Sequence, residues 1–300
     1  MRPKRKFKDV NIIPESDRLT LWLQADGVKP LSASMLLNQG KLYIMKSEES
    51  STPRGSAGDV KSAKRTVQIL EILASSKTSM SLSAISKAGQ IPKSSLHGIL
   101  KTLVDQGWIR FISENNSYVL GLKSLKVGAR FLDTDELTNG ALLYMSQFRD
   151  TFGETINFGR FDGYNVIYLS SFESSKNPRK YSRIGRSIPA YATSMGKAIL
   201  AQKPIEEVES IYPSAFTKLT AKTVPDLSAL KIELAQCRKD GWAIEHGQSS
   251  DGYSCIAVTL NDQYPPINSL SVSLQTKALT NKYRDVVLTE LFSLARKINT

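Results

Sequence analysis

The stretch that decides the fold of the N-terminal half is residues 82–120, LSAISKAGQIPKSSLHGILKTLVDQGWIRFISENNSYVL. Ser83 can cap a short helix that runs to about Ala88, because its hydroxyl accepts from a free backbone N–H of the first turn. Gly89 is expected to end that helix, since glycine accepts the left-handed conformation common at helix ends. Pro92 suits the first turn of a following helix. Two helices joined by a tight turn predict a helix-turn-helix.

The flanking segments extend this unit. Upstream, apolar residues recur at helical spacing and predict an amphipathic helix over residues 62–75. The helix that begins near Pro92 is expected to reach Asp105. Downstream, residues 108–112 and 118–120 are rich in β-forming side chains and flank a turn-rich connection, which is typical of a hairpin. Three helices followed by a hairpin predict a winged helix-turn-helix.

The helix after Pro92 has two distinct faces. Leu96, Leu100 and Leu103 share one side and are expected in the core. Another side carries cations, hydroxyls and an imidazole without a carboxylate: Lys93, Ser94, Ser95, His97 and Lys101. In a recognition helix such side chains contact base edges and phosphates of DNA. An ordinary solvated helix face is the alternative, and the hairpin that follows favours DNA.

The charge balance points in the same direction. The 300 residues contain 40 Lys and Arg against 28 Asp and Glu, which gives a net charge of +12. This excess favours polyanions, with nucleic acid first, acidic membranes second and acidic small ligands third. An apolar fraction of 41% is enough for ordinary globular cores.

Two cysteines, Cys237 and Cys255, and two histidines, His97 and His246, cannot form a disulfide framework and do not favour a zinc site. We therefore expect no metal and no cofactor. No apolar run is long enough to span a membrane, and the basic N-terminus is not followed by a signal-peptide core. These observations predict a cytoplasmic protein.

Several separated motifs resemble the IclR family of transcriptional regulators. Residues 118–128, YVLGLKSLKVG, resemble the junction between the wing and the linker helix of that family. The most specific match is GRSIP at 185–189, which runs into GKAILA at 196–201. The other matches are the first helix with Arg65, residues 91–97, Gly153-Glu154-Thr155, and the helix-glycine-aromatic-alanine step over 230–243. Together they cover about residues 60–298.

The resemblance implies an α/β (α+β) protein with a winged helix-turn-helix and a GAF-like effector-binding domain joined by a linker helix. The expected parts are a flexible N-terminal extension without assigned function (1–59), the DNA-binding domain (60–121), the linker helix (122–140) and the effector-binding domain (141–300). The linker helix is expected to help pair two subunits through Leu122, Leu125, Phe131 and Leu132. A homodimer or a dimer of dimers on a near-palindromic operator follows, with Arg65 among the DNA contacts.

The second half also has a readable pattern of its own. Asp162-Gly163 lies between two β-rich stretches and predicts a hairpin. The remaining elements are expected as helices over 193–201, 226–239 and 282–298 and strands over 242–245, 254–260 and 269–274. Strands that alternate with helices, with one terminal helix on a face, predict an α/β domain built on an antiparallel sheet.

In the family, the effector pocket is lined by residues that align with Ser194, Met195, Glu245, Cys255, Ser271 and Ser273. This set suits a small polar metabolite, often an organic acid in the family. Glu245 would repel an anionic effector unless it is protonated or turned away. Gly98 stands where the family often has arginine, so the operator sequence does not carry over from a relative.

Two other classes of function remain open at this stage. An enzyme would need a nucleophile with a nearby base, and Cys255 with His246 is the nearest such pair. The sequence has no Gly-x-Ser-x-Gly elbow, metal-ligand cluster or phosphate loop, and a small buried thiol is far commoner than a catalytic one. The other class is an orphan DNA-binding protein without an effector. We expect a regulator without catalytic residues.

Overall fold

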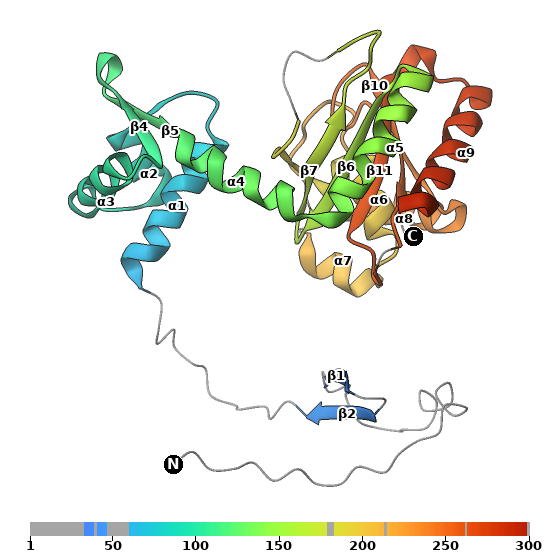
Figure 1. Ribbon diagram of the computed structural model, residues 1–300, viewed down its shortest axis with the longest axis horizontal. Coiled ribbons are helices and arrows are strands. Elements are labelled where there is room, and N and C mark those ends of the chain that lie inside the picture. Colours follow the sequence, from blue (N-terminus) through green and yellow to red (C-terminus); the bar gives the residue numbers. More distant parts are fainter. Residues whose placement is uncertain are drawn as a thin grey trace. The chain divides into compact units, whose positions relative to one another are not determined.

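The computed structural model describes residues 33–38, 41–46, 60–178, 183–212, 215–261 and 263–298. The chain divides into two compact units, residues 1–68 and 69–300, with the boundary inside the first helix. In the first unit, β1 (Ala33–Asn38) and β2 (Lys41–Lys46) pair in an antiparallel hairpin, which the sequence analysis did not predict (Figure 1). The rest of the expected flexible extension, residues 1–59, lies outside the described residues.

The expected helices and hairpin of the DNA-binding domain are present. They are α1 (Lys61–Ser75), α2 (Leu82–Gly89), α3 (Lys93–Asp105), β4 (Ile109–Ile112) and β5 (Ser117–Leu120), with a 3-10 turn at Ser113–Asn115. A two-residue strand, β3 (Met80–Ser81), adds to β5 as a third strand. The core consists of Ile69, Leu73, Ile85, Ile91, Leu96, Leu100, Leu103 and Ile109, all buried.

Helix α2 differs from the sequence prediction at both ends. Its N-cap is Ser81, not Ser83, and the Ser81 hydroxyl accepts from Ala84 N at 3.2 Å. The left-handed residue after the helix is Gln90, with φ of 51°, while Gly89 is still helical. Gly89 is closely packed, because a Cβ there would lie 3.0 Å from the side chains of Ile72 and Ile91.

The segment expected as one linker helix over 122–140 contains a break. Helix α4 covers Leu122–Thr134 and α5 covers Glu136–Phe152. Asp135, between them, has extended backbone and accepts from Thr138 N at 2.9 Å, so it caps α5. The linker helix therefore ends earlier than expected, because the chain leaves the helical conformation at Asp135, which caps the next helix.

The C-terminal domain is built on a six-stranded sheet in the order β8-β7-β6-β11-β10-β9, with every neighbouring pair antiparallel. The antiparallel sheet was predicted, whereas β8 and α7 were not. The strands are β6 (Thr155–Asp162), β7 (Asn165–Phe172), β8 (Ser187–Pro189), β9 (Ala243–His246), β10 (Tyr253–Thr259) and β11 (Asn268–Gln275). The helices are α6 (Ser194–Leu200), α7 (Ile205–Ile211), α8 (Leu227–Asp240) and α9 (Asn281–Ile298). Short 3-10 turns lie at Ala190–Ala192 and Thr276–Ala278.

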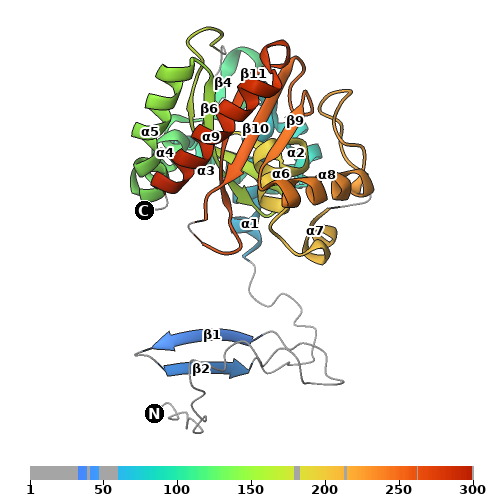
Figure 2. The ribbon, with the colours of Figure 1, turned by 90° about the vertical axis from the view of Figure 1, so that its right-hand side faces the viewer.

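Helices cover both faces of this sheet. Helices α5 and α9 pack on one face over an apolar cluster that includes Ile156, Phe158 and Val272. Figure 2 shows α9 crossing that face beside α5. Helices α6 and α8 lie on the other face, where the core is apolar only in part. In the described residues, no helix is both long and apolar enough to cross a membrane.

Candidate functional site

The face of α3 that was predicted to contact DNA is exposed. Leu96, Leu100 and Leu103 are buried, so the core fixes which side of the helix faces solvent. The side chains on the solvent side are Lys93, Ser94, His97 and Lys101, which are exposed, and Ser95, which is half-buried. Arg65, on α1, is half-buried. The hydroxyls and Lys93 lie at the start of the helix, where a recognition helix meets the base edges.

The far end of this face includes a carboxylate that the sequence analysis overlooked. Lys101 Nζ donates a hydrogen bond to Asp105 Oδ2 at 2.7 Å. That hydrogen bond and the Asp105 charge raise the pKa of Lys101. The (i, i+4) spacing on a helix made the pair predictable from the sequence. Lys93 therefore stands as the cation at the N-terminal end of the face, and Lys101 as half of an ion pair.

The predicted effector residues of the sheet lie on one face. Cys255 of β10 is paired with Glu245 of β9 on one side and with Ser273 of β11 on the other. Ser271 lies two residues before Ser273 on β11. Because alternate residues of a strand face the same side, Cys255, Ser271 and Ser273 share the face covered by α6 and α8. All four are buried.

The structure adds three polar side chains that the sequence analysis missed. Asn157, opposite Ser271 on β6, places Nδ2 at 3.3 Å from Ser273 Oγ and 3.4 Å from Ser271 Oγ. Ser171 Oγ lies 2.9 Å from Asn157 Oδ1 and 3.1 Å from Glu173 Oε1. Cys255 Sγ is 3.1 Å from Ser273 Oγ. We call this set the polar cluster: Asn157, Ser171, Glu173, Cys255, Ser271 and Ser273.

A pattern in the sequence could have revealed the added residues. Thr155 and Asn157 alternate with Ile156 and Phe158, so the polar residues of β6 face the same side as those of β11. A buried strand that alternates polar and apolar residues normally turns the polar ones to water. Here helices cover both faces, so the polar side of β6 must meet protein or a ligand.

Helix α6 covers the cluster face with the two remaining predicted residues. Met195 packs against Gly159 of β6, where a Cβ would lie 2.9 Å from the Met195 sulfur. Ser194 is buried, and its Oγ has no hydrogen-bond partner among the described residues. A buried hydroxyl without a partner is unfavourable by about 1–3 kcal/mol. Ser194 is thus a polar group that a bound molecule could satisfy.

Glu245 is held by the loop that follows it. Its Oε2 accepts from Gln248 N at 2.6 Å, and its Oε1 accepts from Ser249 Oγ at 2.9 Å. Lys197 of α6 is fully buried and donates to Gln248 Oε1 at 2.7 Å, so it binds the same loop. Both Glu245 oxygens therefore accept hydrogen bonds from neutral donors of the chain, which orient the carboxylate towards its own loop.

The Cys255–His246 pair considered from the sequence does not form. Cys255 is opposite Glu245, whereas His246 is opposite Ser254 and places Nδ1 at 2.9 Å from Ser254 Oγ. Consecutive strand residues point to opposite faces, so the thiol and the imidazole are on different sides of the sheet. Among the described residues, no three His, Cys, Asp or Glu side chains gather into a group that could hold a metal ion.

Two family profiles match the chain. The profile described as the IclR helix-turn-helix domain matches residues 62–112, and the profile described as Bacterial transcriptional regulator IclR C-terminal matches residues 129–300. The chain belongs to the IclR family. It is a DNA-binding transcriptional regulator whose C-terminal domain binds an effector that modulates it.

Individual members of the IclR family are similar to this chain over most of their length. The HTH-type transcriptional regulator XynR of Escherichia coli (strain K12) is 31% identical over 219 residues, which cover 72% of this chain and 87% of XynR. The crystal structure of a regulator from Alicyclobacillus acidocaldarius has a TM-score of 0.70 at 22% identity, covering 80% of this chain and 98% of its own. The crystal structure of an IclR homolog from Microbacterium hydrocarbonoxydans, complexed with 4-hydroxybenzoate, has a TM-score of 0.65 at 21% identity. The match covers 79% of this chain and 97% of the homolog. Both structures share the fold.

Proposed function

We propose that the exposed face of α3 binds a near-palindromic operator and that a small metabolite in the polar cluster changes the affinity for it. The observation that carries the DNA-binding part is the orientation of α3. Its three leucines are buried, which leaves Lys93, Ser94, His97 and Lys101 exposed on one helix. Hydroxyls and the imidazole would contact bases or phosphates, and Lys93 would add phosphate affinity.

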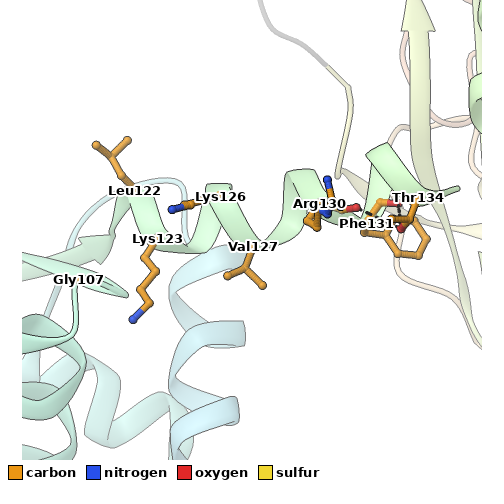
Figure 3. A pocket seen from close by; sticks show the side chains of 8 residues that line it. All are labelled: Gly107, Leu122, Lys123, Lys126, Val127, Arg130, Phe131 and Thr134. Atoms are coloured by element: carbon orange, nitrogen blue, oxygen red, sulfur yellow. Dashed lines mark hydrogen bonds between the residues drawn. The ribbon is translucent and has the colours of Figure 1, made fainter.

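We propose that the protein acts as a homodimer or a dimer of dimers through α4. Leu122, Leu125 and Phe131 are 85%, 69% and 51% exposed, while Leu132 is half-buried. Figure 3 shows the side chains that line a hollow along α4, with Leu122, Val127 and Phe131 as its apolar members. Several exposed apolar side chains on one helix are typical of a contact surface. Pairing two chains would place two α3 helices in successive major grooves, about 34 Å apart.

For the effector we propose a small polar metabolite, with an organic acid as the first class to test. The buried hydroxyls of Ser194, Ser271 and Ser273 and the amide of Asn157 could donate to a carboxylate or accept from hydroxyl groups. Glu245 is hydrogen-bonded to its own loop, which turns its carboxylate towards that loop. The Microbacterium homolog, which has the same fold, is complexed with the acid 4-hydroxybenzoate.

We also propose that the protein acts on DNA in the cytoplasm and has no catalytic role. His246, the base considered for Cys255, lies on the opposite face of the sheet. The orphan alternative, in which the cluster binds nothing, is tested by the thermal stability of the protein with a panel of organic acids. A ligand of the native state stabilises the protein by mass action, by about 2.7 kcal/mol at a hundredfold excess over its Kd, and so raises the melting temperature. A panel without any shift would favour the orphan.

The DNA-binding proposal is tested by fluorescence anisotropy on the DNA upstream of the protein's own gene and its neighbours. Measurements at two salt concentrations with random competitor separate specific from electrostatic binding. We expect a complex that resists competitor and is lost in Lys93→Ala/His97→Ala. Equal binding to every fragment would contradict operator recognition near its own gene.

A further inference from the structure

The turn between α4 and α5 is fastened to the sheet by one arginine. Arg160 of β6 donates from Nη1 to Asp135 Oδ2 at 2.5 Å and from Nη2 to Asp135 Oδ1 at 3.1 Å. A third donor, Nε–H, reaches Asn268 Oδ1 at 2.7 Å, and Asn268 is the buried partner of Arg160 on β11. The sheet therefore fixes the guanidinium, and the guanidinium fixes Asp135 in a bidentate pair.

Asp135 belongs to both helices that meet at this turn. It is the C-cap of α4 and the N-cap of α5. Burial raises the pKa of its carboxyl, but hydrogen bonds from Arg160 and Thr138 and the charge of Arg160 outweigh burial and hold the pKa below its usual value. Phe131, in the last turn of α4, lies with its ring centre 6.0 Å from the Arg160 guanidinium. The arginine thus touches the end of α4 as well as the start of α5.

Strand β6 links this turn to the polar cluster. Asn157 and Arg160 are three residues apart on β6, which corresponds to about 10 Å. Between them lies Gly159, against which Met195 of α6 packs. The pairing of β6 with β7 also shifts register between Phe158 and Gly159. A molecule that moves Asn157 or Met195 would therefore displace β6 next to Arg160.

We propose that the Arg160–Asp135 pair couples the polar cluster to α4, so that the state of the cluster sets the direction in which α4 leaves the C-terminal domain. Arg160 and Asp135 would act as positioning residues, since neither is among the residues proposed to bind DNA or the effector. The inference rests on the proposed roles of α3 and the polar cluster. Because α4 carries the DNA-binding domain, the pair would control the affinity for the operator and leave the affinity for random DNA unchanged.

The structure offers variants matched to this question. Arg160→Gln removes the ion pair, and Asp135→Asn removes it while keeping a residue that caps helices as well as aspartate does. Arg284→Gln is the control, since Arg284 of α9 pairs with Asp285 at 2.8 Å and lies 5.6 Å from the Trp242 ring, away from α4. Asn157→Ser disturbs the cluster and retains a hydrogen-bonding side chain.

The experiment measures a cycle of operator affinities on the full chain. The probes are a duplex that the wild-type protein selects from a random-sequence pool, and an unselected duplex as reference. We expect Asn157→Ser to change the ratio of the two affinities by about fivefold or more, the lower end of typical coupling between sites. In the Arg160→Gln or Asp135→Asn background the same change should be below twofold, and in the Arg284→Gln background it should persist. Independent sites have additive free-energy effects, so that their effects on affinity multiply. The coupling would therefore be overturned if Asn157→Ser changed the ratio by the same factor in every background. It would also be overturned if Asn157→Ser had no effect.

A second measurement separates this inference from the proposed function. If the wild-type protein selects no duplex, operator recognition fails, and hydrogen exchange of residues 131–138 then decides about the pair alone. Exchange there should be faster in Arg160→Gln and Asp135→Asn and unchanged in Arg284→Gln. Equal exchange rates in all the variants and the wild-type protein would show that the Arg160–Asp135 pair does not hold the end of α4. Should Asn157→Ser not fold, Ser171→Ala replaces it, since Ser171 is hydrogen-bonded to the same amide.

Discussion

Lys197 of α6 is fully buried, and its ammonium donates a hydrogen bond to the Glu233 carboxylate of α8. The same ammonium reaches Gln248 Oε1, and Gln248 Nε2 donates to Glu233 Oε1 at 3.0 Å. The three side chains join α6, α8 and the loop that holds Glu245. A buried ammonium needs such partners, because its desolvation is unfavourable by several kcal/mol.

Removing the anionic partner of Lys197 should destabilise the fold. We expect Glu233→Gln to lower the free energy of unfolding by about 2–3 kcal/mol, less than the 3–5 kcal/mol typical of fully buried pairs. The reduction follows from Glu233, whose side chain is 34% exposed. Glu209→Gln, which breaks the surface pair with Lys231, is the control and should cost about 1 kcal/mol or less. Urea unfolding of both variants checks this; equal midpoints would show that Lys197 does not depend on Glu233.

Two helical glycines should respond to alanine with opposite signs. A Cβ on Gly98 in α3 would meet nothing within 4 Å, so Gly98→Ala should stabilise the fold by up to about 1 kcal/mol through helix propensity. A Cβ on Gly196 in α6 would lie 2.2 Å from the Ala190 carbonyl oxygen, so Gly196→Ala should destabilise it by about 1–3 kcal/mol. Thermal unfolding gives both signs. A destabilised Gly98→Ala would mean that α3 needs its glycine for a reason other than packing.

Cys237 should be nearly inert to alkylation. Burial raises the pKa of its thiol to about 11, from 9.0 for an unperturbed group. At pH 8 this lowers the thiolate fraction, and with it the alkylation rate, by about a hundredfold relative to the unfolded chain. Because the folded state favours the neutral thiol, its contribution to stability is present below pH 9 and declines as the pH rises towards 11. Mass spectrometry of iodoacetamide-treated native and urea-unfolded protein measures the ratio, and a ratio near one would contradict burial of the thiol.

The two lysines of the α3 face should differ in their effect on salt dependence. Lys93→Ala should reduce the slope of log affinity against log salt by about 1, the value for one phosphate contact. Lys101→Ala should reduce it less, because Asp105 already neutralises Lys101 at 2.7 Å. Anisotropy titrations over a range of salt concentrations measure both slopes. A larger effect of Lys101→Ala would show that its ion pair opens on DNA.

The elements set by local rules were predictable from the sequence. The spacing of Leu96, Leu100 and Leu103 specified which face of α3 is buried, and hence which face is exposed. The helix expected over 226–239 begins with an aspartate, and Asp226 is the N-cap of α8, where its carboxylate accepts from Ala229 N at 2.8 Å. The expectation failed at Gly89, which is still helical and lies close to Ile72 and Ile91, while Gln90 has the left-handed conformation.

The sequence by itself determined the two domains, the exposed basic face of α3 and the antiparallel sheet, because periodicity, caps and turns act over a few neighbouring residues. Only the tertiary structure decided which polar side chains meet. Asn157 and Ser273 are 116 positions apart and become neighbours through strand pairing. Arg160 reaches Asp135 across 25 positions at the end of a helix. Cys255 and His246, close in the sequence, are separated because the strand alternates its side chains between the two faces of the sheet.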